Sequence, residues 1–412
     1  MTSSVLGPSL VDFHYILSTS LRQVSLVTTI TSLGYCFGAF IGGFAFQYLN
    51  RQFFFIISLS ITALICAFFP FSPSLIIFLP LGFIFSFGNG TLDVTQNTWI
   101  IEMWQQHSNS VLQLAQFMFG LGTIVAPIIQ GPYLTGENNG QNFTNQNMTA
   151  QNITFNNTLV HLNVTGEERR ILLLKPFAVV GGVQLSAMLL MFLMYCYKKY
   201  ERPPIREDNK NDTKLFKSSK LMHYVIITLT SLCLGFYCSI EICHFTYLVT
   251  YAQYKMKMTP LDSAHLQSAL SASYTLMRAA GALIALKLSP GQMITIHLSL
   301  VIGSNIVLLF CSNSLLIFWA ANIVLGAGFS TMWGSIFSFA EKYFQFGNLE
   351  GTMLTTTAGG LSSISMYLIG SLIESHSEML IYFNLFNGLI CLILFLFVNL
   401  IILIWSRRHK IN

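Results

Sequence analysis

Long apolar runs are the feature that most constrains how this chain can fold. A membrane-spanning helix needs about 20 consecutive, mainly apolar residues. Eleven such runs can be read, at residues 25–49, 53–70, 74–103, 110–133, 172–197, 221–252, 264–287, 291–311, 314–340, 352–373 and 379–405. Only 9% of the 412 residues are charged, against about 25% in soluble domains, which is too few to cover a water-exposed surface. The sequence therefore predicts an all-α polytopic membrane protein that lies in a lipid bilayer.

Two long polar segments indicate which side of the membrane each part of the chain faces. Residues 198–220 hold eight Lys and Arg residues, and the tail at residues 406–412 is also basic. The positive-inside rule places both in the cytoplasm. Residues 134–171 carry five acceptor sequences for N-glycosylation, at Asn142, Asn147, Asn152, Asn156 and Asn163. Five acceptors in one hydrophilic loop predict a glycosylated extracellular loop, in a multi-pass plasma-membrane protein with a cytoplasmic C-terminus.

The two halves of the chain repeat one pattern of glycines. Gly88 and Gly90, in FGNGTLDVTQNTW, match Gly326 and Gly328, in LGAGFSTMWGSIFSF. In both halves a short polar turn and another apolar run follow. The repeat predicts a duplicated six-helix unit, which is the arrangement of major facilitator transporters, with the substrate held between the halves near the bilayer midplane.

The spans divide into an N-terminal bundle at residues 1–197, a basic linker at 198–220, a C-terminal bundle at 221–405 and a tail at 406–412. Six spans lie between the linker and the tail, but only five complete spans precede the linker. An odd number would put the N-terminus outside, so we interpret residues 1–17 as part of a further helix. We therefore expect a major facilitator fold of two six-helix bundles with a truncated first helix and about eleven complete spans.

Three charged residues lie deep within predicted spans: Asp93, Glu241 and Arg278. A charge at the bilayer centre costs about 2.5–3.5 kcal/mol on insertion scales, so such residues usually face a water-filled cavity and mark a transport pathway. Two carboxylates and one guanidinium in one cavity would leave one net negative charge, which suits a coupling cation, Na+ or H+. We predict cation coupling by Asp93 and Glu241, and either substrate binding or charge balance by Arg278. A purely structural ion pair is the alternative for Arg278.

Amide side chains accompany Asp93. Four polar residues at the spacing i, i+4, i+7 and i+8 form one stripe on a helix: Asn89, Asp93, Gln96 and Asn97. Gln113 and Gln116 lie three residues apart on the next predicted helix. Because carboxamides both donate and accept hydrogen bonds, this set suits the hydroxyl groups of a neutral polyol. We assign Gln96, Asn97 and Gln116 to substrate binding and the other amides to the cavity wall, with hydrogen bonding between helices as the alternative.

A second polar face carries Glu241. Tyr237, Glu241 and His244 share this face at i, i+4 and i+7, so Tyr237 and His244 are candidates for the cavity lining. The alternatives are packing for the tyrosine and a satisfied core position for the histidine. Asp12, near the extracellular end of the first predicted helix, either lines the cavity or is solvated.

Three motifs resemble the fucose-permease-like branch of the major facilitator superfamily, which includes animal sodium-dependent glucose transporters and the major facilitator superfamily domain-containing 4 proteins. These motifs are GTLDVTQN at 90–97, LQLAQ at 112–116 and FYCSIE at 236–241. The resemblance covers essentially the whole chain and implies hexose uptake coupled to Na+. The turn GGFAFQYLNRQ resembles a worn Gly-x-x-x-Asp-Arg motif in which Asn50 replaces the acid, so gating through a charge pair of Arg51 is not expected.

The resemblance also suggests roles for single residues. Asp93 stands where bacterial fucose:proton symporters have a functional glutamate, and Glu241 stands where the animal proteins have Glu. Asn97 and Gln116 fall on amides of the same motifs. Phe119 replaces an asparagine that contacts sugar in the bacterial motif, which speaks against fucose itself.

These features predict a secondary active transporter, a monosaccharide (glucose-like):cation symporter that works by alternating access as a monomer. The sequence has no phosphate loop, nucleophile motif or metal-spaced cluster, so we expect no enzyme activity, no bound metal, no cofactor beyond the coupling ion and no nucleic-acid partner. Two alternatives remain. The chain carries another small solute, or it is a receptor or scaffold that keeps the fold without transporting.

Overall fold

The computed structural model describes residues 5–45, 48–104, 108–137, 164–201, 220–285, 287–310, 314–343 and 348–410. Within these ranges the chain forms helices joined by turns, with no strand. The predicted all-α fold is therefore confirmed for the described residues. The five predicted glycosylation sites and most of the basic linker lie outside them.

Each apolar run predicted in the N-terminal half corresponds to one long helix. The elements are α1 (Leu10–Ile16), α2 (Leu21–Ala45), α3 (Arg51–Phe68), η2 (Phe69–Phe71), α4 (Leu75–Trp104), α5 (Ser108–Gln130), η4 (Gly131–Tyr133) and α6 (Gly166–Tyr197). The short helix α1 has seven residues and packs on α2 and α6. The fold of this half therefore follows the predicted spans, with α2 beginning four residues earlier than its run at 25–49.

The C-terminal half follows its predicted runs as well. Its elements are α7 (Lys220–Met256), α8 (Pro260–Ile284), α9 (Pro290–Phe310), α10 (Leu315–Phe329), α11 (Met332–Tyr343), α12 (Asn348–Leu372) and α13 (Met379–Lys410). The run at 314–340 is interrupted by a turn between α10 and α11. In the described part of the chain nine helical segments are long and apolar enough to cross a membrane, and α8 and α12 are not among them.

Polar residues at helix starts explain several helix boundaries. Thr165 caps α6, and Glu168 completes a capping box with it. Thr259 accepts a hydrogen bond from the backbone N–H of Asp262 at the start of α8, where Pro260 occupies the first turn. Such caps satisfy amide groups that the helix cannot pair, and each stabilises the helix by about 1 kcal/mol.

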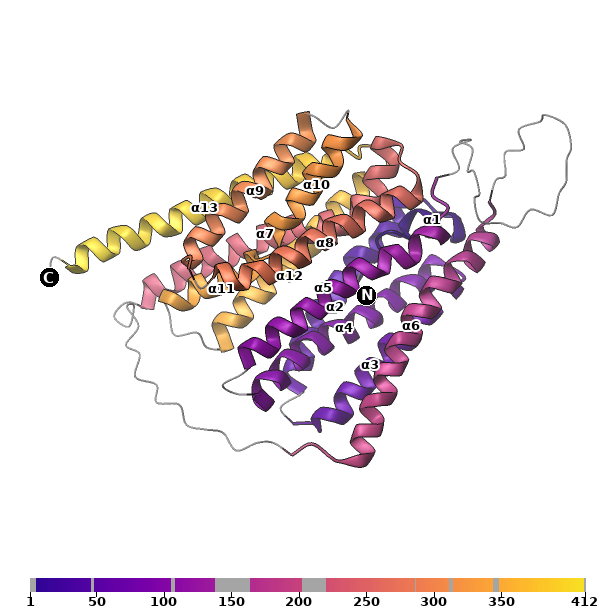
Figure 1. Cartoon of the computed structure of the whole chain (residues 1–412), viewed down its shortest axis with the longest axis horizontal. Helices are drawn as coiled ribbons and strands as arrows, with labels where there is room; N and C mark the ends of the chain where they lie inside the picture. Colours follow the sequence, from indigo (N-terminus) through magenta and orange to yellow (C-terminus); the bar gives the residue numbers. More distant parts are fainter. Residues whose placement is uncertain are drawn as a thin grey trace, which may run out of the picture.

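The helices form two bundles that lie side by side, one from each half of the chain (Figure 1). In the N-terminal bundle α2 packs on α4 and α3 packs on α6, while in the C-terminal bundle α7 packs on α12 and α13. The bundles meet along two helix pairs, α2 with α12 and α5 with α8. The less apolar helices α8 and α12 therefore lie on the interface between the bundles, where small and polar residues allow close helix packing.

The ends of the bundles can be named by the segments beside them. We call the end where α5 stops and α6 begins the sequon end, and the end where α6 stops and α7 begins the basic end; Figure 1 shows them on opposite sides of the molecule. The two bundles are joined near the sequon end. Gly7 lies against the backbone of Thr246 on α7, and the hydroxyl oxygens of Thr28 on α2 and Tyr247 on α7 are 2.6 Å apart.

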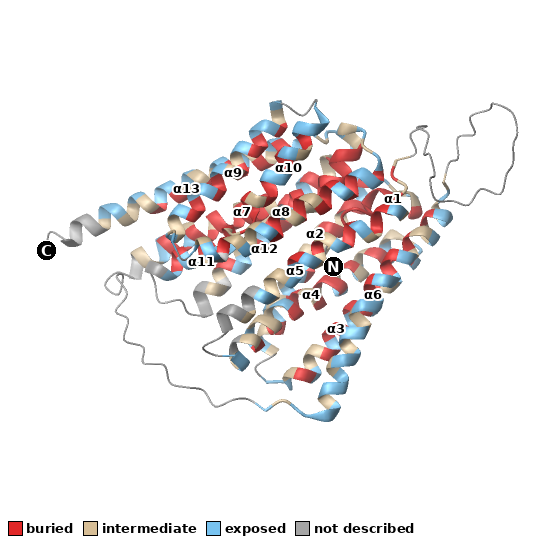
Figure 2. Cartoon of the chain, viewed as in Figure 1, coloured by how far each residue is buried: buried red, intermediate tan, exposed pale blue. Residues whose placement is uncertain are grey.

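The outward faces of the bundles are apolar. Buried residues gather where helices face one another, and exposed residues line the outside (Figure 2). Large apolar side chains such as Phe40, Ile76 and Leu316 are exposed by 67, 82 and 78%. An apolar exterior of this kind suits contact with lipid, because the lipid tails are apolar and the backbone groups in the middle of each helix are paired within it.

Candidate functional site

Helices α2 and α4 approach each other closely through glycines. A Cβ added at Gly38 would collide with the carbonyl oxygen of Phe87, and one at Gly90 would collide with the carbonyl oxygen of Tyr35. Glycine permits this approach because it lacks a side chain. The close packing brings the side chain of Tyr35, on α2, next to Asp93 on α4.

Asp93 is one acidic residue of the candidate site. It lies about 27 Å along α4 from Leu75, near the middle of that 30-residue helix. The Oη of Tyr35 donates a hydrogen bond to Oδ2 of Asp93 at 2.5 Å. Both side chains are exposed, Tyr35 by 40%. The carboxylate is therefore accessible although it lies within a helix long and apolar enough to cross a membrane.

Arg278, on α8, joins the two bundles at the level of this carboxylate. Its Nη1 donates a hydrogen bond to Oε1 of Gln116 on α5 at 3.0 Å, and its guanidinium carbon lies 4.8 Å from the centroid of the Tyr274 ring. Its positive charge acts on both Asp93 and Glu241. Because these partners come from both bundles, the cluster lies between the bundles and not on the lipid-facing exterior.

Glu241, on α7, is the second carboxylate of this cluster. It is half-buried, and the hydroxyl groups of Tyr237 and Tyr274 lie beside its carboxylate. Tyr237 is fully buried and donates a hydrogen bond to the carbonyl oxygen of Phe329 at 2.7 Å. Tyr237 therefore supports Glu241 from the packed interior, whereas the sequence suggested that it lines the cavity.

Arg278 thus lies within electrostatic range of both Asp93 and Glu241, so the three deep charges face the same region between the bundles. An opposite charge nearby favours the ionised form of a carboxylate, and a second carboxylate nearby disfavours it. Arg278 therefore eases the presence of two acids in one site, while their combined charge leaves the site attractive to a cation.

The amide residues of α4 lie within four residues of Asp93 in the sequence. Gln96 and Asn97 are half-buried. Asn89 is also half-buried and donates a hydrogen bond to the carbonyl oxygen of Phe85, one turn earlier on α4, at 3.1 Å. Gln116 contacts the charged cluster directly through Arg278. Gln113 lies on α5, and its side chain lies outside the described part of the structure.

His244 lies in the packed interior of the C-terminal bundle and does not line the cavity. Its Nδ1 is 3.0 Å from Nδ2 of Asn384 and its Nε2 is 2.9 Å from Oδ1 of Asn322. An amide nitrogen donates and an amide oxygen accepts, so the histidine is neutral with its proton on Nε2. Both ring nitrogens are satisfied, which makes His244 a structural residue that links α7, α10 and α13.

Asp12 neither lines the cavity nor is solvated, because it forms a buried ion pair. Its Oδ1 lies 2.7 Å from Nη1 of Arg169, and each side chain is 1% exposed. Arg169 also donates to the carbonyl oxygen of Gly136 at 2.6 Å and lies over the ring of Tyr15, while Thr135 donates its backbone N–H to Asp12. The pair fastens α1 and the segment after η4 to α6. The sequence did not reveal it, because Arg169 is 157 residues away.

Arg51 forms a charge pair after all. Its Nη2 and Nε donate to Oε2 of Glu102 at 3.0 and 3.1 Å. The acidic partner of Arg51 therefore comes from the end of α4 and not from position 50. Asn50 caps α3 by accepting a hydrogen bond from the backbone N–H of Phe53. Tyr200 donates its hydroxyl to Oε1 of Glu102 at 3.1 Å. Burial raises the pKa of Tyr200 to about 12, so this hydroxyl stays protonated at neutral pH.

Two tyrosines of the site, Tyr35 and Tyr274, were missed by sequence reasoning. Tyr274 lies four residues before Arg278, a spacing that brings side chains together on a helix, so the sequence did carry a signal for it. Tyr35 carried none, because its contact with Asp93 depends on how closely α2 and α4 approach.

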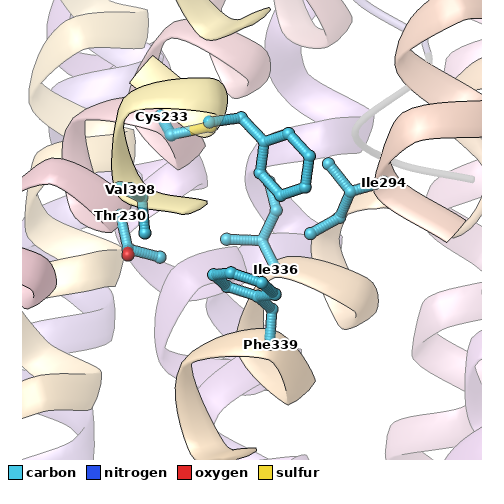
Figure 3. Close-up of a pocket in the computed structure, with 7 residues that line it drawn as sticks. Thr230, Cys233, Ile294, Ile336, Phe339 and Val398 are labelled. Atoms are coloured by element: carbon cyan, nitrogen blue, oxygen red, sulfur yellow. The ribbon is translucent and has the colours of Figure 1, made fainter. Parts of the chain in front are cut away.

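A small cavity elsewhere in the molecule is not part of this site. It lies between α7, α9, α11 and α13, and Figure 3 shows the largely apolar side chains around it. Its lining residues include Thr230, Cys233, Ile294, Ile336, Phe339 and Val398. None of the three deep charges borders it, so we regard it as a gap in the packing of the C-terminal bundle.

The fold and the charged cluster between two bundles define the class of protein. The Major Facilitator Superfamily model matches residues 1–373, so the chain belongs to the major facilitator superfamily, a superfamily of transporters and not of enzymes. Sodium-dependent glucose transporter 1 from Xenopus laevis is 24% identical over 376 residues, which span 90% of this chain and 70% of that protein. Sodium-dependent glucose transporter 1A from Mus musculus is 24% identical over 371 residues, spanning 90% and 83%.

Solved structures of transporters share the fold at low sequence identity. The xylose transporter XylE from E. coli, in a partially occluded inward open conformation, superposes with a TM-score of 0.69 at 11% identity, covering 96% of this chain and 92% of XylE. The Major Facilitator Superfamily transporter FucP, in the outward conformation, gives a TM-score of 0.55 at 18% identity and covers 97% of each chain. The predicted major facilitator fold is thereby confirmed.

Proposed function

We propose that this chain is a secondary active transporter that carries a monosaccharide, glucose-like in its chemistry, together with a cation by alternating access. The observation that carries the proposal is the meeting of Asp93, Glu241 and Arg278 between the two bundles. Charged side chains in a membrane protein are costly, and they persist where they serve a pathway. The relatives named as sodium-dependent glucose transporters support the choice of solute and of a coupled cation.

Asp93 is the coupling carboxylate in this proposal, and Glu241 is the second acid of the cation site. Na+ or H+ neutralises Asp93, and Arg278 then interacts more strongly with Glu241. Arg278 also holds Gln116 of the other bundle, so a change of charge at the acids acts on a contact between the bundles. This gives cation binding a physical route to the relative position of the bundles.

The solute binds beside the acids through amide groups. Gln96, Asn97 and Gln116 pair with sugar hydroxyls, because an amide offers both donors and acceptors. The exposed ring of Tyr35 supplies an apolar face for the sugar ring. Neutral amides around a charged centre favour an uncharged, hydroxylated solute over an organic ion.

The predicted topology completes the proposal. With the glycosylated loop outside the cell and the C-terminus in the cytoplasm, the joined sequon end faces outward. The accessible Asp93 and Tyr35 then face the cytoplasmic side, as expected for a monomeric plasma-membrane carrier in its inward-open form.

The test is the substitution Asp93→Asn in the full chain, reconstituted into proteoliposomes with radiolabelled D-glucose. We expect accumulation driven by a Na+ or H+ gradient to be lost, because the amide has no negative charge that a cation could bind to and neutralise. Exchange of labelled for unlabelled glucose at equal concentrations should persist. A panel of other monosaccharides, amino acids and organic ions in the same vesicles identifies the solute class.

The matched control is Asp262→Asn, which removes an exposed carboxylate in the first turn of α8. It should leave accumulation unchanged. If the Asp93→Asn protein still concentrates glucose against its gradient, Asp93 is not the coupling residue. If the unaltered chain moves none of the panel solutes, the proposed transport function itself is wrong.

A further inference from the structure

Three glutamine side chains are buried where the bundles meet near the sequon end. They are Gln130 on α5, Gln253 on α7 and Gln267 on α8, exposed by 0, 5 and 2%. Each has an amide atom without a hydrogen-bond partner among the described residues: Oε1 of Gln130, Oε1 of Gln267, and both Oε1 and Nε2 of Gln253.

Gln253 belongs to the C-terminal bundle but lies against the N-terminal half. A Cβ added at Gly136, in the segment after η4, would come 3.0 Å from Oε1 of Gln253. Gln253 lies about 4.5 Å along α7 from Met256. Its unpaired amide is therefore held in the contact between the bundles, close to the sequon end.

Gln267 and Gln130 lie on the facing surfaces of α8 and α5. Ser268, the residue after Gln267, donates a hydrogen bond to the carbonyl oxygen of Ile124 on α5 at 3.2 Å. A Cβ at Gly131, the residue after Gln130, would reach Ala264 on α8.

Gln267 is well separated from the charged cluster. It lies about 17 Å along α8 from Arg278. The glutamines and the cluster are therefore two distinct polar regions on the interface between the bundles.

Unpaired amides are costly in this conformation. A buried polar atom without a partner costs about 1–3 kcal/mol, and an apolar side chain at the same position would avoid that cost. A chain with 53% hydrophobic residues nevertheless has three glutamines at this interface. If the bundles separated here, water or solute could reach these amides and supply the missing partners.

We infer that Gln253 and Gln267, together with Gln130, form a second solute site that is exposed when the sequon end opens. The inference rests on the proposed function, since a solute must pass between the bundles. The site takes an uncharged molecule with several hydroxyl groups, because its free groups are amide donors and acceptors. Gln130 contributes through Oε1, since its Nε2 already donates to Ser9 and to the carbonyl oxygen of Val5, each at 2.7 Å.

The experiment compares glucose entry and exit in cells that express the full chain. The variants are Gln253→Met, Gln267→Met and their combination, because methionine has a similar length and no strong hydrogen-bonding group. Gln184→Met is the control, since Gln184 lies on α6, which packs on α1, α3 and α5 of its own bundle. We expect the half-saturation concentration for glucose on the sequon side to rise about fivefold per glutamine. The value on the opposite side and the control should not change.

Three results separate this inference from the proposed function. Unchanged entry in a variant of a transporting chain overturns the inference. Equal rises on both sides also overturn it, because they would place the glutamines in the central site. Absence of glucose flux in the unaltered chain overturns the proposed function instead.

A labelling measurement tests the inference without net flux. Gln253→Cys is combined with Cys36→Ser, which removes the half-buried free thiol of α2. The protein is treated on the sequon side with a membrane-impermeant maleimide, with and without glucose. Labelling that glucose slows supports the site. A thiol that is never labelled, or whose labelling glucose does not affect, overturns it.

Discussion

At the scale of single residues, the charged cluster depends on neutral partners as much as on its charges. Tyr35 donates to Asp93, and Gln116 accepts from Arg278. A hydrogen bond to a charged group is worth about 1.5–3 kcal/mol. The neutral partners therefore influence how firmly the carboxylate holds its charge, and hence, in the proposed function, how strongly it binds a cation.

Replacing Tyr35 by Phe removes the hydroxyl donor and leaves the ring. A carboxylate without this donor gains more from neutralisation, so we expect the half-saturation concentration of the coupling cation to fall about tenfold. Cation release and the maximal transport rate should slow accordingly. Tyr48→Phe is the control, because Tyr48 is 74% exposed and lies outside the site. Glucose uptake at a series of cation concentrations gives the measurement, and an unchanged half-saturation would show that this hydrogen bond does not affect coupling.

The sequence predicted which residues are charged within the membrane, but it did not predict most of their partners. Asp93, Glu241 and Arg278 stand out because a charge in an apolar run needs an explanation. Tyr35 does not, because a tyrosine is common in such runs and its contact is created by glycines on two helices. The prediction that Asp12 lines the cavity or is solvated was wrong because its partner, Arg169, lies on another helix. The sequence does not indicate that these two residues come together in space.

At the scale of helices, the joined sequon end is held in part by a contact between α7 of the C-terminal bundle and α2 of the N-terminal bundle. The Tyr247 hydroxyl lies 2.6 Å from Oγ1 of Thr28 on α2 and 3.1 Å from the carbonyl oxygen of Met366 on α12. A side chain at Gly370 would collide with this hydroxyl. Tyr247 is thus a fastening between the bundles, and opening of this end must break its contact with Thr28.

Tyr247→Phe should weaken this fastening while keeping the ring in place. Loss of one hydrogen bond is worth about 1 kcal/mol, so we expect the sequon end to open about fivefold more often. The readout is the rate at which an impermeant maleimide labels Ser25→Cys, because Ser25 is 1% exposed in the joined state. Tyr251→Phe is the matched control on α7, since its ring packs on Phe318 of the same bundle. Equal labelling rates in the two variants would contradict this role.

Helices as elements were well predicted because their main signal, a long apolar run, is local in sequence. The exceptions have local causes too. The turn between α10 and α11 at Ser330 and Thr331 falls inside one continuous apolar run, and apolar composition does not report such an interruption. The sequence predicted the two duplicated bundles. It did not predict that α2 meets α12 and α5 meets α8, because the pairing of helices depends on which of their faces meet in space.

At the scale of the whole molecule, the orientation in the membrane decides what transport direction the structure represents. The predicted orientation rests on the five acceptor asparagines and on the basic linker. Enzymatic removal of N-linked glycans from the expressed chain should lower its apparent mass on a gel. Asn→Gln changes at the acceptor sites should lower it in steps. Asn211 of the basic linker also stands in an acceptor sequence, Asn-Asp-Thr, and Asn211→Gln is the control without effect because this linker is predicted to be cytoplasmic. A chain of unchanged mass would contradict an extracellular position for this loop.

The interface that divides the molecule also affects how a cell can make it. Ribosomes deliver the helices to the insertion machinery in chain order. Each helix, including α8 and α12, partitions into lipid according to its own apolar content. These two helices are the least suited to remain in lipid alone, since their polar and small residues face the opposite bundle. Their retention during synthesis must therefore rely on neighbours already in the bilayer. We expect biogenesis to fail first at the same surface that the mature protein needs for movement.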